Sequence, residues 1–241
     1  MKNAVVTGST KGIGYAIAKV LLADGYFVFM NYAADDKAAG RARRELAADF
    51  AGCFEIIKRP LMTQADVTAF HSEVVGKVRG IDLLVCNVAT TDRTAWREMS
   101  WEQWNNVMNV NLNAPAALVR AFDPHINMGG GILFIGAIMG IYAHAVSIPY
   151  SVSKAGVHAL TKALVKEYCG RNIRVNAIAP GFVDTPWQTE KPIDQKNRIC
   201  DKISLGRFAT PQEIADIALN VIHCTYLNGA VIEADGGYCY R

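Results

Sequence analysis

The sequence of 241 residues predicts one α/β domain, with a parallel, doubly wound sheet covered by helices on both faces. Apolar runs of strand length alternate with segments of helical apolar spacing along the chain. The first such run leads directly into a glycine-rich loop and a helical segment, which is how a β-α-β unit begins. Neither an internal repeat nor a low-complexity segment interrupts this order, so we expect a single domain over residues 1–241.

The expected elements follow from these patterns in order. Apolar runs predict strands at residues 3–6, 26–31, 54–57, 81–86, 131–135, 173–178 and 230–233. Helical spacing predicts helices at residues 15–23, 38–50, 65–78, 101–122, 150–168 and 211–222. Residues 182–203 are polar and irregular in pattern, so we expect them to form a lid over a substrate.

The composition is that of a globular protein without a strong charge bias. The 51% of hydrophobic residues can form a buried core, and 25 basic residues against 22 acidic ones give a net charge of only +3. No basic run carries interleaved aromatic residues. Neither nucleic acid nor a membrane surface is therefore predicted as a partner.

The compartment is predicted from three absences in the sequence. There is no signal-peptide pattern at the N-terminus, and the longest apolar region, residues 131–146, is interrupted by glycines and too short to span a membrane. The six cysteines are scattered, without a Cys-x-x-Cys pair or a histidine at ligand spacing. We expect a cytoplasmic protein with reduced, mostly buried thiols and no metal site.

The loop after the first expected strand reads Thr7-Gly8-Ser9-Thr10-Lys11-Gly12-Ile13-Gly14. Backbone amides at the start of a helix can reach a pyrophosphate only where no Cβ atom stands in the way, which is a reason for glycines here. A tight strand-to-helix turn without a ligand is the alternative for an isolated motif. As the first element of an α/β chain, the loop predicts a dinucleotide-binding Rossmann fold.

The end of the second expected strand bears on which dinucleotide binds. In such folds an acidic residue at this point binds the ribose 2′-hydroxyl, and its absence leaves room for a 2′-phosphate. Here no carboxylate follows Asn31 and Tyr32 before Asp35, and Lys11 in the glycine loop can meet a phosphate. The sequence favours NADP(H); NAD(H) stays open because Asp35 or Asp36 could fold back.

Tyr150 and Lys154 stand at the start of an expected helix, four residues apart and therefore on one helical face. A phenol with an ordinary pKa of about 10 is a poor proton donor or acceptor near neutrality unless a positive charge favours its ionised form. Lys154 supplies such a charge. For this pair in isolation, two exposed side chains on a surface helix would be the alternative.

Several motifs of this kind occur together in a fixed order. They are Thr7-Gly8-xxx-Gly12-Ile13-Gly14, Asn87-x-Ala89, Asn111, Tyr150-xxx-Lys154, Pro180-Gly181-xxx-Thr185 and Asp235-Gly236-Gly237. In order and spacing, the chain resembles the short-chain dehydrogenase/reductase family over almost its whole length. Within that family it is similar to the 3-oxoacyl-[acyl carrier protein] reductase branch.

This resemblance implies an NAD(P)-dependent oxidoreductase in which single residues have defined roles. Tyr150 would be the general acid that protonates a carbonyl oxygen, Lys154 would hold the nicotinamide ribose and lower the pKa of Tyr150, and Asn111 would anchor a water that passes protons to Lys154. A homotetramer or homodimer is also implied. The expected cofactor-binding residues are Gly8, Ser9, Thr10, Lys11, Gly12, Ile13, Gly14, Tyr32, Leu61, Asn87, Ala89, Tyr150, Lys154, Pro180, Gly181, Val183 and Thr185.

The main departure from the family pattern lies on the substrate side. Ala137 stands where the family carries the serine whose hydroxyl binds the substrate oxygen. Loss of such a donor can lower a rate by roughly 10²–10³. Either Ser147 or Tyr142 replaces it, or the substrate is a quinonoid or C=N compound that needs no second donor. We expect substrate contacts from Ala137, Tyr142, His144, Ser147 and Trp187.

Two further departures concern the cofactor. Thr90 stands where the family has a glycine, and its side chain leaves less room for the dinucleotide. The acidic residue that often touches adenine maps to Pro60, so adenine contact would depend on the backbone near Leu61.

The expected function is an NADPH-dependent reduction of a carbonyl of the 3-oxoacyl or ketone type, on a small molecule or an acyl thioester. One alternative is a reductase of quinonoid or C=N substrates. Another is a catalytically impaired NADP-binding subunit or redox-responsive protein, which Ala137 and Thr90 suggest. Retention of Tyr150, Lys154 and Asn111 opposes that alternative, because proton transfer groups are not needed simply to hold a dinucleotide.

Overall fold

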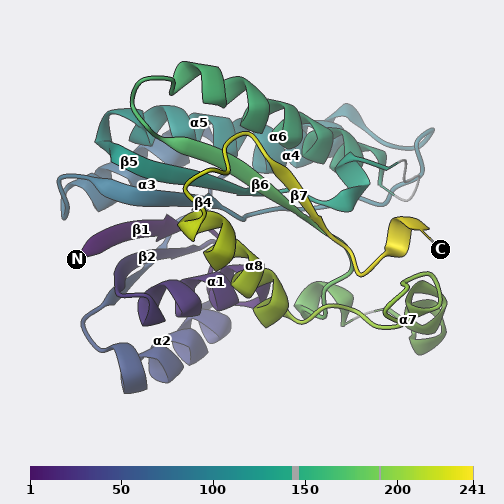
Figure 1. Ribbon diagram of the computed structural model, residues 1–241. Coiled ribbons are helices and arrows are strands. Elements are labelled where there is room, and N and C mark those ends of the chain that lie inside the picture. The colour runs from purple at the N-terminus through teal and green to yellow at the C-terminus, as the bar shows by residue number, and fades with distance from the viewer. Residues whose placement is uncertain (143–146, 190, 241) are drawn as a thin grey trace.

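Seven parallel strands form one continuous sheet in the computed structural model, which describes residues 1–142, 147–189 and 191–240 (Figure 1). Their spatial order is β3-β2-β1-β4-β5-β6-β7. The order reverses between β1 and β4, and in such sheets a ligand crevice lies outside the carboxyl ends of the strands at this point. The bounds are β1 Lys2–Val6, β2 Tyr26–Tyr32, β3 Phe54–Lys58, β4 Ile81–Cys86, β5 Ile126–Ile135, β6 Arg174–Pro180 and β7 Val231–Ala234.

Helices cover both faces of the sheet (Figure 1). One face carries α1 (Gly12–Ala23), α2 (Asp36–Phe50) and α8 (Pro211–His223). The other carries α3 (Gln64–Val75), α4 (Trp101–Met108), α5 (Ala114–Phe122) and α6 (Ile148–Glu167), and α7 (Ile193–Cys200) lies beyond the carboxyl ends of the strands. The predicted doubly wound α/β fold is confirmed.

Each face of the sheet has its own hydrophobic core. Along β1, Ala4 and Val6 belong to the core that includes α1 and α8, whereas Val5 belongs to the core on the opposite face. Because helices bury both faces, the central strands are continuous apolar runs instead of alternating ones. This property makes them easy to recognise in the sequence.

One strand is longer than expected. β5 begins at Ile126 and not at residue 131, and its pairing with β4 shifts in register between Ile81 and Leu83. Residues 127–129 at this end are exposed. An exposed strand start that runs into glycines lacks the apolar pattern by which a strand is recognised.

Two expected segments differ in detail from the structure. The helix expected at residues 101–122 is α4 and α5 joined by a π-helical turn, Asn109–Asn113. The lid expected to be irregular contains a 3₁₀ turn, Pro186–Gln188, and the helix α7. The prediction missed α7 because this short helix is mostly polar and buries no residue.

The thiols are also less buried than expected. All six cysteines are free, but only Cys86 is buried, while Cys169 and Cys224 are exposed. Among the helices in the described ranges, none combines the length and the apolar character that a membrane crossing needs.

Candidate active site

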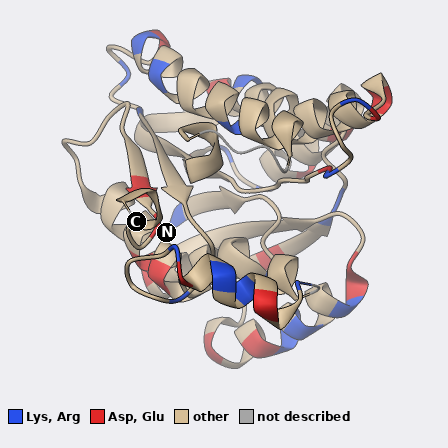
Figure 2. Ribbon diagram, turned by 90° about the vertical axis from the view of Figure 1, so that its right-hand side faces the viewer, with Lys and Arg blue, Asp and Glu red and all other residues tan. Residues whose placement is uncertain are grey.

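A cleft of about 1150 Å³ lies along the carboxyl ends of the strands. The glycine loop forms one wall, the start of α6 with Tyr150 and Lys154 forms another, and residues between Gly181 and Lys202 lie over it. Figure 2 shows the molecule from this edge, where blue and red segments lie beside one another on the helices that cover the sheet. Residues far apart in the sequence thus meet at the edge that the fold predicts for a ligand.

The glycine loop has the shape that a dinucleotide phosphate requires. Gly8 and Gly12 both have φ of +60°, which favours glycine. A Cβ on Gly14 would lie 2.4 Å from the carbonyl oxygen of Gly8, so this turn admits no side chain there. No side chain caps the start of α1. The first amides of α1 are therefore available to a phosphate.

Two asparagines outside the loop hold it in place. Asn87 Nδ2 donates to the carbonyl oxygens of Thr7 and Gly8 at 3.0 and 2.9 Å. Asn31 Oδ1 accepts from the Gly8 amide, and Asn31 Nδ2 donates to the carbonyl oxygen of Arg59. Asn31 was not among the expected site residues. Its signal in the sequence is an uncharged amide at the end of an otherwise apolar strand.

Three expected cofactor residues do not line the cleft. Ser9 is fully buried and donates its hydroxyl to the Val6 carbonyl oxygen, Gly14 lies behind the loop, and Leu61 packs in a core. Contact of these three residues with a cofactor stays a prediction. The cleft is lined by Gly8, Thr10, Lys11, Gly12, Ile13, Tyr32, Asn87, Ala89, Tyr150, Lys154, Pro180, Gly181, Val183 and Thr185.

The outer end of the cleft carries a pair of opposite charges. Lys11 Nζ lies 2.8 Å from Asp35 Oδ2, and both side chains are half exposed. Asp35 also caps α2 by accepting from the Ala38 amide. The hydrogen bond from Lys11 holds the pKa of Asp35 below its usual value. Asp35 therefore lies beside the glycine loop. This is the arrangement for which the sequence left NAD(H) open as the cofactor.

Tyr150 and Lys154 lie on the cleft side of the first turns of α6. Lys154 is almost fully buried, its Nζ donates to the Ile135 carbonyl oxygen at 2.7 Å, and it lies 5.7 Å from the centroid of the Tyr150 ring. Burial lowers the pKa of Lys154 to about 8 and raises the pKa of Tyr150 to about 12. The pKa of Tyr150 in this structure is therefore raised by burial, whereas the sequence predicted that Lys154 would lower it.

Ala137 is the second residue after β5 and is buried in the wall of the cleft that Tyr150 and Lys154 also line. The glycines around it are required by packing. A Cβ on Gly136 would meet His158 Nε2, and one on Gly140 would lie 2.6 Å from the Ala155 amide of α6. The loop is thus pressed against α6 on both sides of Ala137.

The two hydroxyls expected to replace that serine have other partners. Ser147 donates to the Asp92 carbonyl oxygen and accepts from Thr91 Oγ1, although it does line the cleft. Tyr142 does not line the cleft, because its hydroxyl donates to Glu233 Oε2 at 2.8 Å. Neither hydroxyl is placed to donate to a substrate oxygen. His144 lies outside the described residues.

The lid contributes an aromatic ring and an amide. The centroids of the Trp187 and Tyr150 rings lie 6.1 Å apart. The sequence predicted a substrate contact from Trp187, and its ring stands beside the proposed acid. Beside it, Gln188 is only 9% exposed, lines the cleft, and its Oε1 has no hydrogen-bond partner in the described part of the chain. Gln188 was missed because nothing local in the sequence marks a buried, unpaired amide.

Asn111 lies in the π-helical turn and connects two segments of the site. Its side chain accepts from the Thr90 amide, donates to the Thr90 carbonyl oxygen and donates to Ser153 Oγ. These bonds hold the β4 loop against α6 next to Lys154. They use both hydrogens of the amide and one acceptor position of its oxygen, and the water relay through Asn111 stays a prediction.

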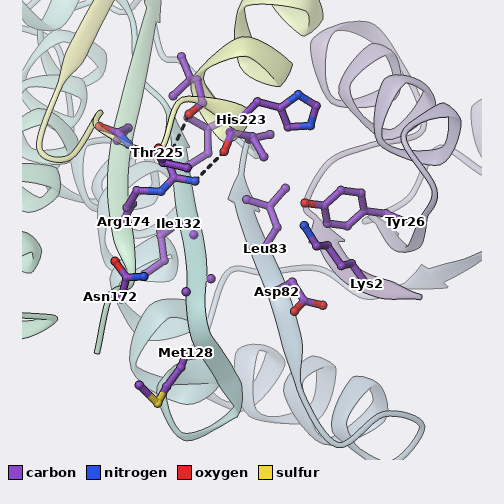
Figure 3. A pocket seen from close by; sticks show the side chains of 17 residues that line it. Lys2, Tyr26, Asp82, Leu83, Met128, Ile132, Asn172, Arg174, His223 and Thr225 are labelled. Carbon is purple, nitrogen blue, oxygen red and sulfur yellow. Dashed lines mark hydrogen bonds between the residues drawn. The ribbon is translucent and has the colours of Figure 1, made fainter. Parts of the chain in front are cut away.

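A smaller hollow of about 360 Å³ lies at the opposite, amino-terminal edge of the sheet (Figure 3). The Arg174 guanidinium beside it donates to the carbonyl oxygens of Val221, Ile222 and Cys224 at the end of α8. Asp82 accepts from a strand amide and a side-chain amide. The charges of this hollow serve the structure of the edge.

Comparison with known proteins agrees with this site. A family model described as "Enoyl-(Acyl carrier protein) reductase" matches residues 8–239. The "3-oxoacyl-[acyl-carrier-protein] reductase FabG" of Aquifex aeolicus is 32% identical over 240 residues, covering 98% of this chain and 96% of that protein. The "3beta-hydroxysteroid dehydrogenase 1" of Eggerthella lenta is 33% identical over 243 residues, covering 98% and 93%.

Solved structures show the same architecture. A short-chain dehydrogenase/reductase from Serratia marcescens superposes with a TM-score of 0.92 at 26% identity, covering 98% of this chain and 97% of that one. The Pseudomonas aeruginosa RhlG/NADP active-site complex gives 0.90 at 28% identity, covering 98% and 96%. Fold and site together define a nicotinamide-dependent oxidoreductase. The chain belongs to the short-chain dehydrogenase/reductase family.

Proposed function

We propose that the protein is an NADPH-dependent reductase of a carbonyl group, with Tyr150 as the general acid and Lys154 as its partner. The observation that carries this proposal is the position of Tyr150 and Lys154 in one cleft with the open glycine loop. The names of relatives that reduce 3-oxoacyl groups support a substrate of the 3-oxoacyl or ketone type, free or as an acyl thioester.

A reduced nicotinamide, when bound, supplies the hydride that adds to the carbonyl carbon. As the C=O π bond breaks, the oxygen takes the phenolic proton of Tyr150, and the product is an alcohol. The resulting phenolate is stabilised by the charge of Lys154, which can also donate to the ribose hydroxyls. Asn111 bonds both the loop after β4 and α6, and so holds them in fixed relative positions. Tyr150 and Lys154 on α6 thereby stay aligned.

For the cofactor we propose NADP(H) in preference to NAD(H). Lys11 is half exposed at the outer end of the cleft, next to Tyr32 and a short run of alanines, and can accept a 2′-phosphate as a new partner. Asp35 competes for Lys11 and could accept a 2′-hydroxyl. The preference is therefore expected to be a matter of degree.

A second candidate is a reductase of a quinonoid or C=N substrate. It is favoured by one observation: Ala137 has no hydroxyl, and the hydroxyls of Ser147 and Tyr142 have other acceptors. A substrate that needs only one proton donor would not suffer from this loss. Both candidates use Tyr150 and Lys154 in the same way.

We also propose a homodimer or homotetramer, as the family resemblance implies. Supporting this, Trp96 in the loop before α4 and Trp101 at its start are 56% and 73% exposed, a large apolar surface for an isolated chain.

Replacement of Tyr150 by Phe tests the proposal. The variant should lose at least about 10³-fold in kcat, because it lacks the acidic proton, while its Kd for NADPH changes less than about threefold. Tyr226→Phe, at a tyrosine that is 98% exposed, is the matched control. Undiminished turnover in Tyr150→Phe would rule out the proposed acid.

A further inference from the structure

The lid end of the cleft gathers positive charge that the reaction itself does not use. Arg93 comes from the loop after β4, Lys191 from the segment before α7, and Arg198 and Lys202 from α7 and its end; all four line the cleft. In the part of the chain that the structure describes, none of the four has an ion-pair partner. Like charges that line one cleft raise its positive potential and attract an anionic ligand.

The acids nearby do not neutralise this cluster. Asp92, next to Arg93, accepts from the Thr94 amide and stabilises its own loop. Asp201 lines the cleft as a single exposed carboxylate, and Asp35 at the other end is paired with Lys11. Among the described residues that line this end of the cleft, four are basic and Asp201 is acidic.

Lys191 lies near Arg93 and is partly withdrawn from water, whereas Arg93 is exposed. Burial lowers the pKa of Lys191, and Arg93 and then Lys196 lower it further, which requires the three cations to be neighbours. Lys191 is also half-buried, unlike the exposed Arg198 and Lys202. A charge in such a position gains more from an anionic ligand than a fully solvated one does.

Both cations are tied to the segment that carries Tyr150. The Lys191 amide donates to the Gln188 carbonyl oxygen, and Trp187, next in the chain, contacts the Tyr150 ring. On the other side, Ser147 at the start of α6 donates to the carbonyl oxygen of Asp92, the neighbour of Arg93. Tyr150, Trp187, Gln188, Lys191 and Arg93 thus line one continuous cleft.

We propose that the lid end of this cleft binds an anionic group of the substrate, a carboxylate or a phosphate, through Lys191 and Arg93, with Arg198 and Lys202 adding positive charge. This inference rests on the proposed function and specifies its substrate class. Two kinds of substrate carry such an anionic group. One is a short keto acid with its carboxylate, and the other is an acyl thioester with the phosphate of its phosphopantetheine arm.

Two matched pairs of substrates separate these sources. The first is acetoacetate against its methyl ester, and the second is the acetoacetyl thioester of 4′-phosphopantetheine against that of pantetheine. The wild-type protein should prefer the anionic member of one pair by about tenfold or more in kcat/KM, and the preference should fall with added salt. The pair that shows the preference identifies the source.

Variants then test the two residues. Lys191→Met and Arg93→Met should each remove most of that preference, about tenfold, while the rate with the neutral member stays within about twofold. Lys196→Met and Arg97→Met are matched controls, because these neighbours do not line the cleft. Equal use of both members by the wild type, or a preference that persists in Lys191→Met and Arg93→Met, overturns the proposal.

A binding measurement keeps this test separate from the proposed function. If no substrate is reduced, the proposed function fails, and calorimetry with acetoacetate or 4′-phosphopantetheine on the NADP-loaded protein decides the anion site. Binding that weakens about tenfold in Lys191→Met but not in Lys196→Met supports the site. No binding of either anion to the wild type overturns it.

Discussion

Lys154 is a charged residue in an apolar position. Only 2% of it is exposed, and burial lowers its pKa from 10.5 to about 8. Below about pH 8 the folded protein holds a buried ammonium, which opposes folding. Between pH 8 and 10.5 the unfolded chain binds more protons than the folded one, so this unfavourable contribution fades as the pH rises.

Lys154→Met should therefore raise the free energy of unfolding by about 1–3 kcal/mol at pH 7 and abolish turnover. The gain should shrink as the pH approaches 10.5. Urea denaturation without cofactor, across this pH range, measures it. Lys162→Met, at an exposed lysine of the same helix, should change stability little. If Lys154→Met is less stable than the parent at pH 7, the bond from Lys154 to Ile135 outweighs the burial.

We propose that Ala137 influences which substrate class the site accepts. Ala137→Ser should speed ketone reduction by about tenfold, because a second hydroxyl then meets the developing oxyanion. Reduction of a quinonoid substrate should change little. Steady-state rates with both substrates measure the effect, and Ala137→Val, which adds volume without a donor, is the control. A slower ketone reaction in Ala137→Ser would mean that the pocket is shaped for another substrate.

Residues of the site were predictable where the chemistry lies within one short segment. Gly8, Gly12 and the Tyr150–Lys154 pair follow from local spacing, and the structure brings them into one cleft. Asn31 and Gln188 were missed because their roles depend on groups that tertiary structure alone brings near. The same limit explains Tyr142, whose partner Glu233 lies 91 positions away.

At the scale of the element, predictability follows burial. β1, β2 and β4 are apolar on both faces and were recognised almost to the residue. The start of β5 and the whole of α7 bury little, so their sequences carry no periodic signal. The π-helical turn was likewise not predictable, since a single inserted residue leaves the apolar spacing of a long helix nearly unchanged.

The end of α8 depends on a side chain from another element. Arg174→Met removes the three bonds from Arg174 to carbonyl oxygens at the end of α8, of which Figure 3 shows those to Val221 and Ile222. It should lower the free energy of unfolding by about 1–3 kcal/mol. Urea denaturation measures the change, with Arg120→Met at an exposed helical arginine as control. Reductase activity of the folded variant should stay near that of the parent, because this hollow lies at the opposite edge. An unchanged stability would show that water replaces Arg174 there.

At the scale of the whole molecule, the strand order explains the position of the site. The reversal between β1 and β4 brings the glycine loop, the loop after β5 and the start of α6 to one edge. The alternation of strands and helices was enough to predict this edge. It could not fix how the lid lies over the edge, and so the charges of Arg93, Lys191, Arg198 and Lys202 escaped the sequence analysis.

The most direct test of the account is steady-state oxidation of NADPH, and of NADH in parallel, by the purified protein. The substrates are a 3-oxoacyl thioester, a simple diketone, a quinone and a quinonoid dihydropterin. The account predicts turnover of the thioester or the diketone, faster with NADPH than with NADH. Turnover of only the last two substrates would make the second candidate the function. No turnover of any substrate, with NADPH bound, would contradict the assignment of Tyr150 and Lys154 to catalysis.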